Sequence, residues 1–132
     1  MNLSITKIAA VLALIIGAMA VFAGGRVLLG ILPDYYVINW LPVYNYTVGI
    51  LTVSVTAVLL WKNHRYARPA AVISFTAHAL VMVILLTAYR AVVAPDSLVA
   101  MTVRLVVWAV IVALLLAQTT EKFSWDKRGA RK

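Results

Sequence analysis

The sequence predicts an all-α fold: a bundle of four helices that cross a membrane, with both chain termini in the cytoplasm. Three observations support this prediction. Hydrophobic residues make up 64% of the 132 residues and charged residues only 12%, whereas a soluble domain is roughly half apolar and a quarter charged. Four apolar stretches approach the roughly 20 residues that a hydrocarbon core requires. Most basic residues lie in the polar segments of one side, as the positive-inside rule expects.

The whole chain, 1–132, is expected to form a single transmembrane domain, since its length is that of one ordinary domain. It contains no cysteine, which excludes disulfides, iron–sulfur clusters and thiolate zinc sites. The net charge of +8 would suit nucleic acid, but no basic face with interleaved aromatic rings accompanies it. We therefore expect no nucleic-acid partner, and we assign the cations to a bilayer with anionic headgroups.

The first predicted helix spans 8–32 and is stopped by Pro33, which cannot continue a helix. Its apolar run, preceded by Lys7 and containing Ala18-Met19-Ala20, also resembles a signal peptide with its cleavage site. We expect the segment to be retained as a helix.

Small side chains recur at four-residue steps along this first helix, at Ala9, Ala13 and Gly17. Such spacing lets two helix backbones approach closely, which replaces the hydrophobic driving force that is missing in lipid. We assign this face to helix packing, either inside the bundle or against a partner chain.

The second helix is predicted over 42–61, with Pro42 in the first turn, where a missing N–H has no cost. The segment before it and the helix's first turns are rich in aromatic residues. We interpret these as a belt at the outer headgroup level, with a ligand platform as the alternative. The belt consists of Tyr35, Tyr36, Trp40, Tyr44 and Tyr46.

The third helix is predicted over 69–89 and the fourth over 97–118, the latter with Asp96-Ser97 as its capping start. A polar tail, 119–132, follows. Nine of the twelve lysines and arginines lie before the first helix, between the second and third, or after the fourth. This bias places both termini in the cytoplasm. The lack of a long polar domain favours a bacterial or archaeal plasma membrane.

Arg104 is the strongest candidate for a functional side chain, because a charge at membrane depth costs free energy unless it is paired. It lies roughly 10 Å inside the outer end of the fourth helix. Asp96 shares its helix face and offers a structural ion pair. The functional alternative is an anion or headgroup site that Arg104 forms with Arg26 and Arg90.

His78 lies near the middle of the third helix, at the expected depth of Thr52 and Trp108 on neighbouring helices. The structural interpretation is a neutral imidazole hydrogen-bonded to a hydroxyl or carbonyl group. The functional alternatives are a proton relay, a hydrogen bond to a quinone or a haem shared with another subunit. Within one chain, haem lacks a second histidine at this depth, because His64 lies in a loop. We otherwise predict no cofactor.

Catalytic and metal-binding motifs are absent: there is no HExxH, glycine-rich phosphate loop or nucleophile triad. Length and helix count are similar to those of small multidrug-resistance transporters, but the acidic residue that these need in the first helix is missing. We therefore expect a non-enzymatic subunit or accessory factor that packs with other subunits of a larger membrane complex. The alternatives are a small oligomeric transporter or channel for an anionic or lipid-like solute, and a quinone- or haem-associated anchor that uses His78.

Overall fold

The computed structural model describes residues 2–31 and 38–130, with the backbone alone over 119–128. Within these residues every regular element is a helix, joined by turns, and there is no strand. Four of its helical segments are long and apolar enough to cross a membrane: Leu3–Leu28, Trp40–Trp61, Ala67–Thr87 and Pro95–Gln118. The prediction of an all-helical chain is thereby confirmed. The elements are α1 (Leu3–Leu28), α2 (Trp40–Leu51), the π-helix η1 (Thr52–Thr56), α3 (Ala57–Trp61), α4 (Ala67–Thr87) and α5 (Pro95–Gly129).

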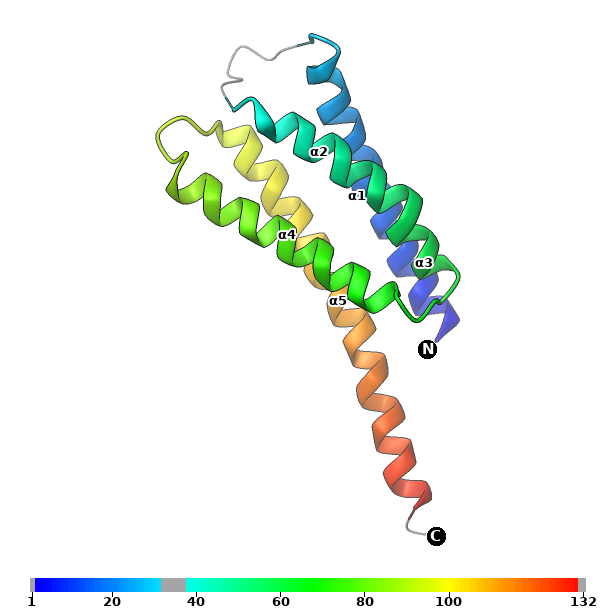
Figure 1. The fold of residues 1–132 in the computed structure, drawn as a ribbon. Helices are drawn as coiled ribbons and strands as arrows, with labels where there is room; N and C mark the ends of the chain where they lie inside the picture. The colour runs from blue at the N-terminus through cyan, green and yellow to red at the C-terminus, as the bar shows by residue number, and fades with distance from the viewer. Residues whose placement is uncertain (1, 32–37, 131–132) are drawn as a thin grey trace.

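The helices form two antiparallel pairs that lie against each other (Figure 1). In one pair α1 packs along α2, η1 and α3, which follow one another as a continuous helical segment; in the other, α4 packs along α5. α5 also contacts α1 and so joins the two pairs. The N-terminus, the α3–α4 turn and the C-terminal part of α5 lie at the same end of the bundle (Figure 1). We call this the basic end, after Lys7, Lys62, Arg65 and Arg68.

α1 begins earlier and ends earlier than the predicted 8–32. Asn2 caps its first turn, because the Asn2 Oδ1 accepts a hydrogen bond from Ser4 N at 3.0 Å. Its end is set by Gly30, whose φ of 86° lies in the left-handed region. Gly30 N donates to Val27 O at 3.0 Å and Ile31 N to Arg26 O at 2.9 Å. This pattern is a Schellman motif, and it ends the helix before Pro33 is reached.

α5 runs through most of the predicted polar tail instead of ending at 118. It contains 35 residues, a length of about 52 Å. No glycine or proline interrupts the sequence between Pro95 and Gly129, so nothing in the backbone chemistry stops the helix earlier. Its last turns project beyond the other helices at the basic end (Figure 1).

The core has two parts, one toward each end of the bundle. At the basic end, small residues of α1 and α4 pack around larger side chains of α3 and α5; the buried members include Ala9, Ala13, Leu60, Ala71, Trp108 and Ile111. At the opposite end, the buried cluster is Ile38, Leu41, Val81, Leu85 and Met101. The small-residue face of the first helix therefore lies inside the bundle, and its third member, Gly17, is buried against η1.

Candidate functional site

Arg104 is held inside the bundle by a hydrogen bond between α5 and α2. Its side chain is only 6% exposed, and its Nη1 donates to the Asn45 Oδ1 at 2.6 Å. A hydrogen bond from a charged donor is about twice as strong as a neutral one. The bond therefore compensates part of the cost of burying the guanidinium and fixes the rotation of α2 relative to α5.

His78 of α4 is 3% exposed and bonds within its own helix. Its Nδ1 lies 2.8 Å from the Ser74 carbonyl oxygen. Because that oxygen can only accept, Nδ1 must carry the hydrogen, and in the neutral ring Nε2 is then the acceptor. Two aromatic rings flank the imidazole: Tyr44 at 5.8 Å and Trp108 at 6.2 Å between ring centroids.

Tyr44 brings a third polar group to the same region. Its hydroxyl is buried and has no hydrogen-bond partner among the described residues. The guanidinium of Arg104 is close enough to interact electrostatically with both Tyr44 and His78. We call Tyr44, Asn45, His78 and Arg104 the buried polar cluster, in which His78 and Arg104 are buried and Tyr44 and Asn45 half-buried. The cluster joins α2, α4 and α5.

The buried polar cluster offers groups that suit an oxygen-rich or anionic ligand. Arg104 supplies a cation with several N–H donors, Tyr44 a hydroxyl donor, and His78 an Nε2 that accepts a hydrogen bond or ligates a metal. His64 lies elsewhere, in the α3–α4 turn, where its Nδ1 accepts from Tyr66 N at 3.3 Å. Within the described ranges, no group of three or more His, Cys, Asp or Glu side chains is arranged to hold a metal ion.

The other candidate residues lie in different places. Arg26 is exposed in the last turn of α1, with its guanidinium 5.5 Å from the Phe22 ring centroid. Arg90 is exposed after the end of α4, and Asp96 is exposed in the first turn of α5. Of the three arginines proposed as an anion site, Arg104 is thus the buried one.

The predicted aromatic belt divides into two environments. Trp40 and Tyr44 pack against the core of the end opposite the basic end, and Trp40 Nε1 donates to the Tyr89 hydroxyl at 2.9 Å. Tyr46 is exposed, and Tyr35 and Tyr36 lie outside the described residues.

Thr52 is buried in η1. The Thr52 methyl group is so close to α1 that a Cβ atom on Gly17 would lie 2.9 Å from it. The structure therefore places Thr52 in the contact between η1 and α1.

Sequence reasoning did not identify Asn45 as the partner of Arg104. Counted from the starts of α2 and α5, the two residues lie about 8 and about 14 Å along their helices. An arginine that extends outward covers this difference, because long basic side chains reach toward the nearer end of a span. The depth comparison was therefore available in the sequence; the rotation that turns Asn45 toward α5 was not.

The fold and this cluster define the class to which the chain belongs: an all-helical protein with four candidate membrane spans around a buried polar cluster. Compared with protein families, curated proteins and solved structures, the chain matches none of them.

Proposed function

We propose that this chain is a multi-pass protein of the plasma membrane and a non-enzymatic subunit or accessory factor of a larger membrane complex. The four apolar helical segments support membrane insertion. The common end of the N-terminus, the α3–α4 turn and the C-terminal helix supports a cytoplasmic position for both termini (Figure 1), because this end also carries most of the basic residues.

The observation that carries the subunit role is the large apolar surface that the bundle leaves uncovered. In each of the three later spans, only 28% of the residues in the most apolar window are buried. Large side chains such as Phe22 (66% exposed) and Ile73 (68% exposed) point outward. Apolar surface on this scale marks contact with lipid or with another protein.

The polar groups, in contrast, bond inside the bundle. Arg104 bonds to Asn45, Trp40 to Tyr89 and His78 to Ser74. The first two bonds join different segments and stabilise their packing, whereas the third lies within α4. Van der Waals contact is then the means by which the outer faces recognise a neighbouring helix.

The proposal is tested by purifying the chain in a mild detergent and determining the composition of the complex by native mass spectrometry. We expect unrelated chains at a fixed stoichiometry. Two sets of alanine substitutions probe separate outer faces: Ile8, Ile15 and Phe22 on α1, and Ile73 and Leu80 on α4. If one of these faces binds the partner, its set of substitutions should release the partner, whereas the other set, as the matched control, should not. A monomer or a pure homo-oligomer contradicts the subunit role.

A second candidate function is supported by the Tyr44 hydroxyl, which is buried without a partner close to Arg104 and His78. We propose as the alternative a small oligomeric transporter or channel for an anionic or lipid-like solute that binds at the buried polar cluster. In liposomes containing the purified chain, halide flux should fall when Arg104 is changed to Gln and persist with Arg65→Gln, which removes an exposed charge. Flux that is absent, or equal in both variants, contradicts this function.

The same cluster supports a quinone- or haem-associated anchor, since the rings of Tyr44 and Trp108 flank the His78 imidazole. A stacked quinone suits these side chains in its reduced form, because a quinol hydroxyl donates a hydrogen bond to Nε2, whereas the oxidised carbonyl accepts one only from a protonated imidazolium. Solvent extraction of the purified complex followed by ultraviolet spectroscopy detects quinone, and visible absorption detects haem. Loss of the signal in His78→Leu supports the anchor role; a preparation that holds neither contradicts it.

A further inference from the structure

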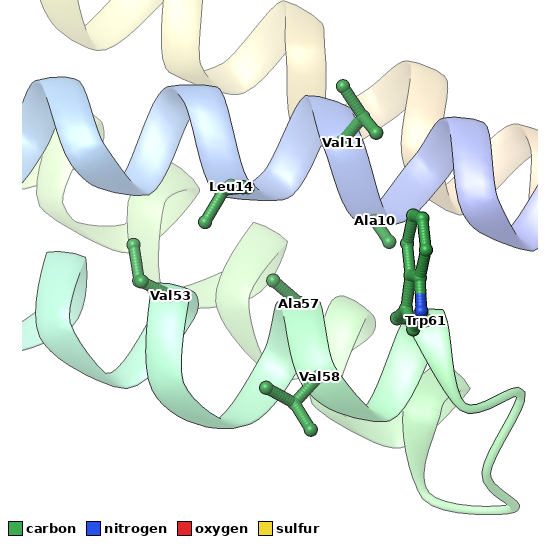
Figure 2. A pocket seen from close by; sticks show the side chains of 7 residues that line it. All are labelled: Ala10, Val11, Leu14, Val53, Ala57, Val58 and Trp61. Carbon is green, nitrogen blue, oxygen red and sulfur yellow. The ribbon is translucent and has the colours of Figure 1, made fainter.

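An apolar groove lies between α1 and the η1–α3 part of the second span. Its volume is about 200 Å³. Figure 2 shows side chains of the two helices facing each other across it. Buried Ala10 and Ala57 leave the space at its floor, and exposed side chains form its rim. All its lining residues are apolar: Ala10, Val11, Leu14, Val53, Ala57, Val58 and Trp61.

Positive charge is concentrated where this groove reaches the basic end. The Lys7 Nζ lies 5.3 Å from the centroid of the Trp61 ring, and Lys62 follows Trp61 with an exposed side chain. No acidic residue occurs in 1–31 or 38–95, the segments that contain α1, the second span and the α3–α4 turn. The groove thus combines an apolar slot with cations that lack a neighbouring carboxylate on these elements.

The dimensions of the groove fit a hydrocarbon chain. From Val53 to Trp61 it extends about 12 Å along the helix. A protein cavity of about 150 Å³ binds benzene, so this volume suits a segment of an acyl chain, whereas a helix about 10 Å in diameter is too wide. Tryptophan favours the headgroup level of a membrane, which places the Lys7–Trp61 end where the polar part of a lipid lies.

We propose that this groove binds one acyl chain of an anionic phospholipid, with Lys7 and Lys62 holding the headgroup phosphate. The proposal rests on the membrane insertion proposed above and is independent of the subunit role. Trp61 closes the end of the slot, and the Lys7 ammonium over its ring is positioned to pair with the phosphate. A zwitterionic lipid of the same chain length would fill the slot but gain less from the two cations.

The test is native mass spectrometry of the purified chain with added phosphatidylglycerol or phosphatidylcholine of identical acyl chains. We expect phosphatidylglycerol to bind more strongly. Lys7→Gln should weaken phosphatidylglycerol binding about fivefold, the usual effect of one basic residue near a lipid surface, and weaken phosphatidylcholine binding less, because choline already offsets the charge of its phosphate. Arg65→Gln is the matched control, because it removes a charge from the same end of the bundle. The Arg65 guanidinium donates to the Tyr66 hydroxyl at 2.9 Å and is not part of the proposed phosphate site. Equal losses in both variants, or no preference for the anionic lipid, overturn the proposal.

The acyl-chain half of the site is tested separately. Val58→Phe adds bulk at the exposed rim, where the fold tolerates it, and should weaken the binding of both lipids. A phosphatidylglycerol with a photoreactive group on its acyl chain should label α1 between Ala10 and Leu14 or the facing helix between Val53 and Trp61. Labelling confined to other helices, or a second copy of the chain bound in place of lipid, overturns the proposal. Membrane fractionation of every variant separates these outcomes from a failure of insertion.

Discussion

Arg104 carries a full positive charge inside the bundle, where a charge without partners is strongly destabilising. Its bond to Asn45 is short, at 2.6 Å, and crosses between α5 and α2. Both residues lie in spans whose other side chains are mostly apolar, so this bond contributes both free energy and specificity to the pairing of the two helices.

Replacing Asn45 with Val should therefore lower the free energy of unfolding by about 1.5–3 kcal/mol, the range for a hydrogen bond to a charged group. Asn45→Asp is the matched control, because its carboxylate still accepts from the guanidinium and adds an opposite charge. Thermal unfolding in one detergent, followed by circular dichroism, compares the variants. Equal stability of the Val variant and the unchanged chain would show that the bond contributes nothing.

Asn63 provides a second prediction at the level of single residues. Its φ of 53° lies in the left-handed region, where it ends α3 through bonds from Asn63 N to Leu60 O and His64 N to Leu59 O. This conformation is unfavourable by about 1–2 kcal/mol for a residue with a Cβ, whereas glycine adopts it without strain. Asn63→Gly should therefore unfold at a higher temperature than Asn63→Ala.

The control for Asn63 is a position at which alanine should be more stable than glycine. Ala18 is exposed within α1, and in a helix interior glycine is less favourable than alanine by about 1 kcal/mol. Ala18→Gly should accordingly lower the unfolding temperature. If alanine were the better residue at both positions, the left-handed conformation of Asn63 would not be what ends α3.

Residues with unusual chemistry were identifiable from the sequence, but their partners were not. Arg104 and His78 stand out because each interrupts an apolar run, and Trp108 was expected at the depth of His78. Asn45 and Tyr44 face the cluster only because α2 is rotated that way. Since the apolar faces of a membrane helix differ little from one another, sequence periodicity does not determine that rotation.

At the scale of helices, glycines allow α1 and α2 to approach closely. A Cβ on Gly49 would lie 2.8 Å from Val21 N, and one on Gly24 would lie 2.7 Å from Pro42 O. Both neighbouring atoms are backbone atoms, so they cannot move aside by changing a rotamer. Gly25, the next residue, would bring its Cβ no closer than 3.6 Å to the Tyr46 ring.

These distances predict opposite outcomes at adjacent positions. Gly24→Ala and Gly49→Ala should each lower the free energy of unfolding by about 1–3 kcal/mol, as overpacking does. Gly25→Ala should be neutral or slightly stabilising, because alanine favours the helix. Unfolding in detergent compares the three variants, and equal effects at Gly24 and Gly25 would rule out close packing of α1 against α2.

The presence of the four spans was predictable from the sequence, but the ends of the helices and their local geometry were less so. The four apolar runs correspond to the four candidate spans, because hydropathy over about 20 residues averages out local exceptions. The π-helical turn at Thr52–Thr56 has no sequence signature of its own. It widens the backbone locally, and Thr52, Thr56, Ala57 and Leu60 are all buried on this stretch. The early end of α1 could have been expected at Gly30, since glycine ends helices as readily as proline does.

For the whole molecule, the distribution of charge along the chain corresponds to its distribution in space. Lys7, Lys62, Arg65 and Arg68 belong to segments that lie far apart in the sequence but meet at the basic end (Figure 1). Arg26 lies in the last turn of α1 and Arg90 follows α4, at the other end of the bundle. An antiparallel arrangement of four spans places successive turns at opposite ends, and the basic residues follow the same division. The fold thus groups the segments whose charge supports the proposed orientation.

This orientation predicts the outcome of reporter fusions. A reporter that is active only in the cytoplasm should be active after Lys132 and within the α3–α4 turn at Asn63, and inactive in the α4–α5 turn at Val92. An alkaline phosphatase reporter, which requires the opposite compartment, should give the reverse pattern at each site.

A charge-swapped variant shows whether the basic residues are the cause of this orientation. Changing Lys62, Arg65 and Arg68 to Gln, with lysines placed at Ala91 and Val92, should produce a mixed or inverted orientation, because basic residues near span ends are retained on the cytoplasmic side. Glutamines without the added lysines serve as the control and should give a weaker effect. An orientation that is unchanged by the swap would show that charge does not determine it. In the unchanged chain, reporters on opposite sides at Asn63 and Lys132, or cytoplasmic activity at all three sites, would contradict a bundle that crosses the membrane four times.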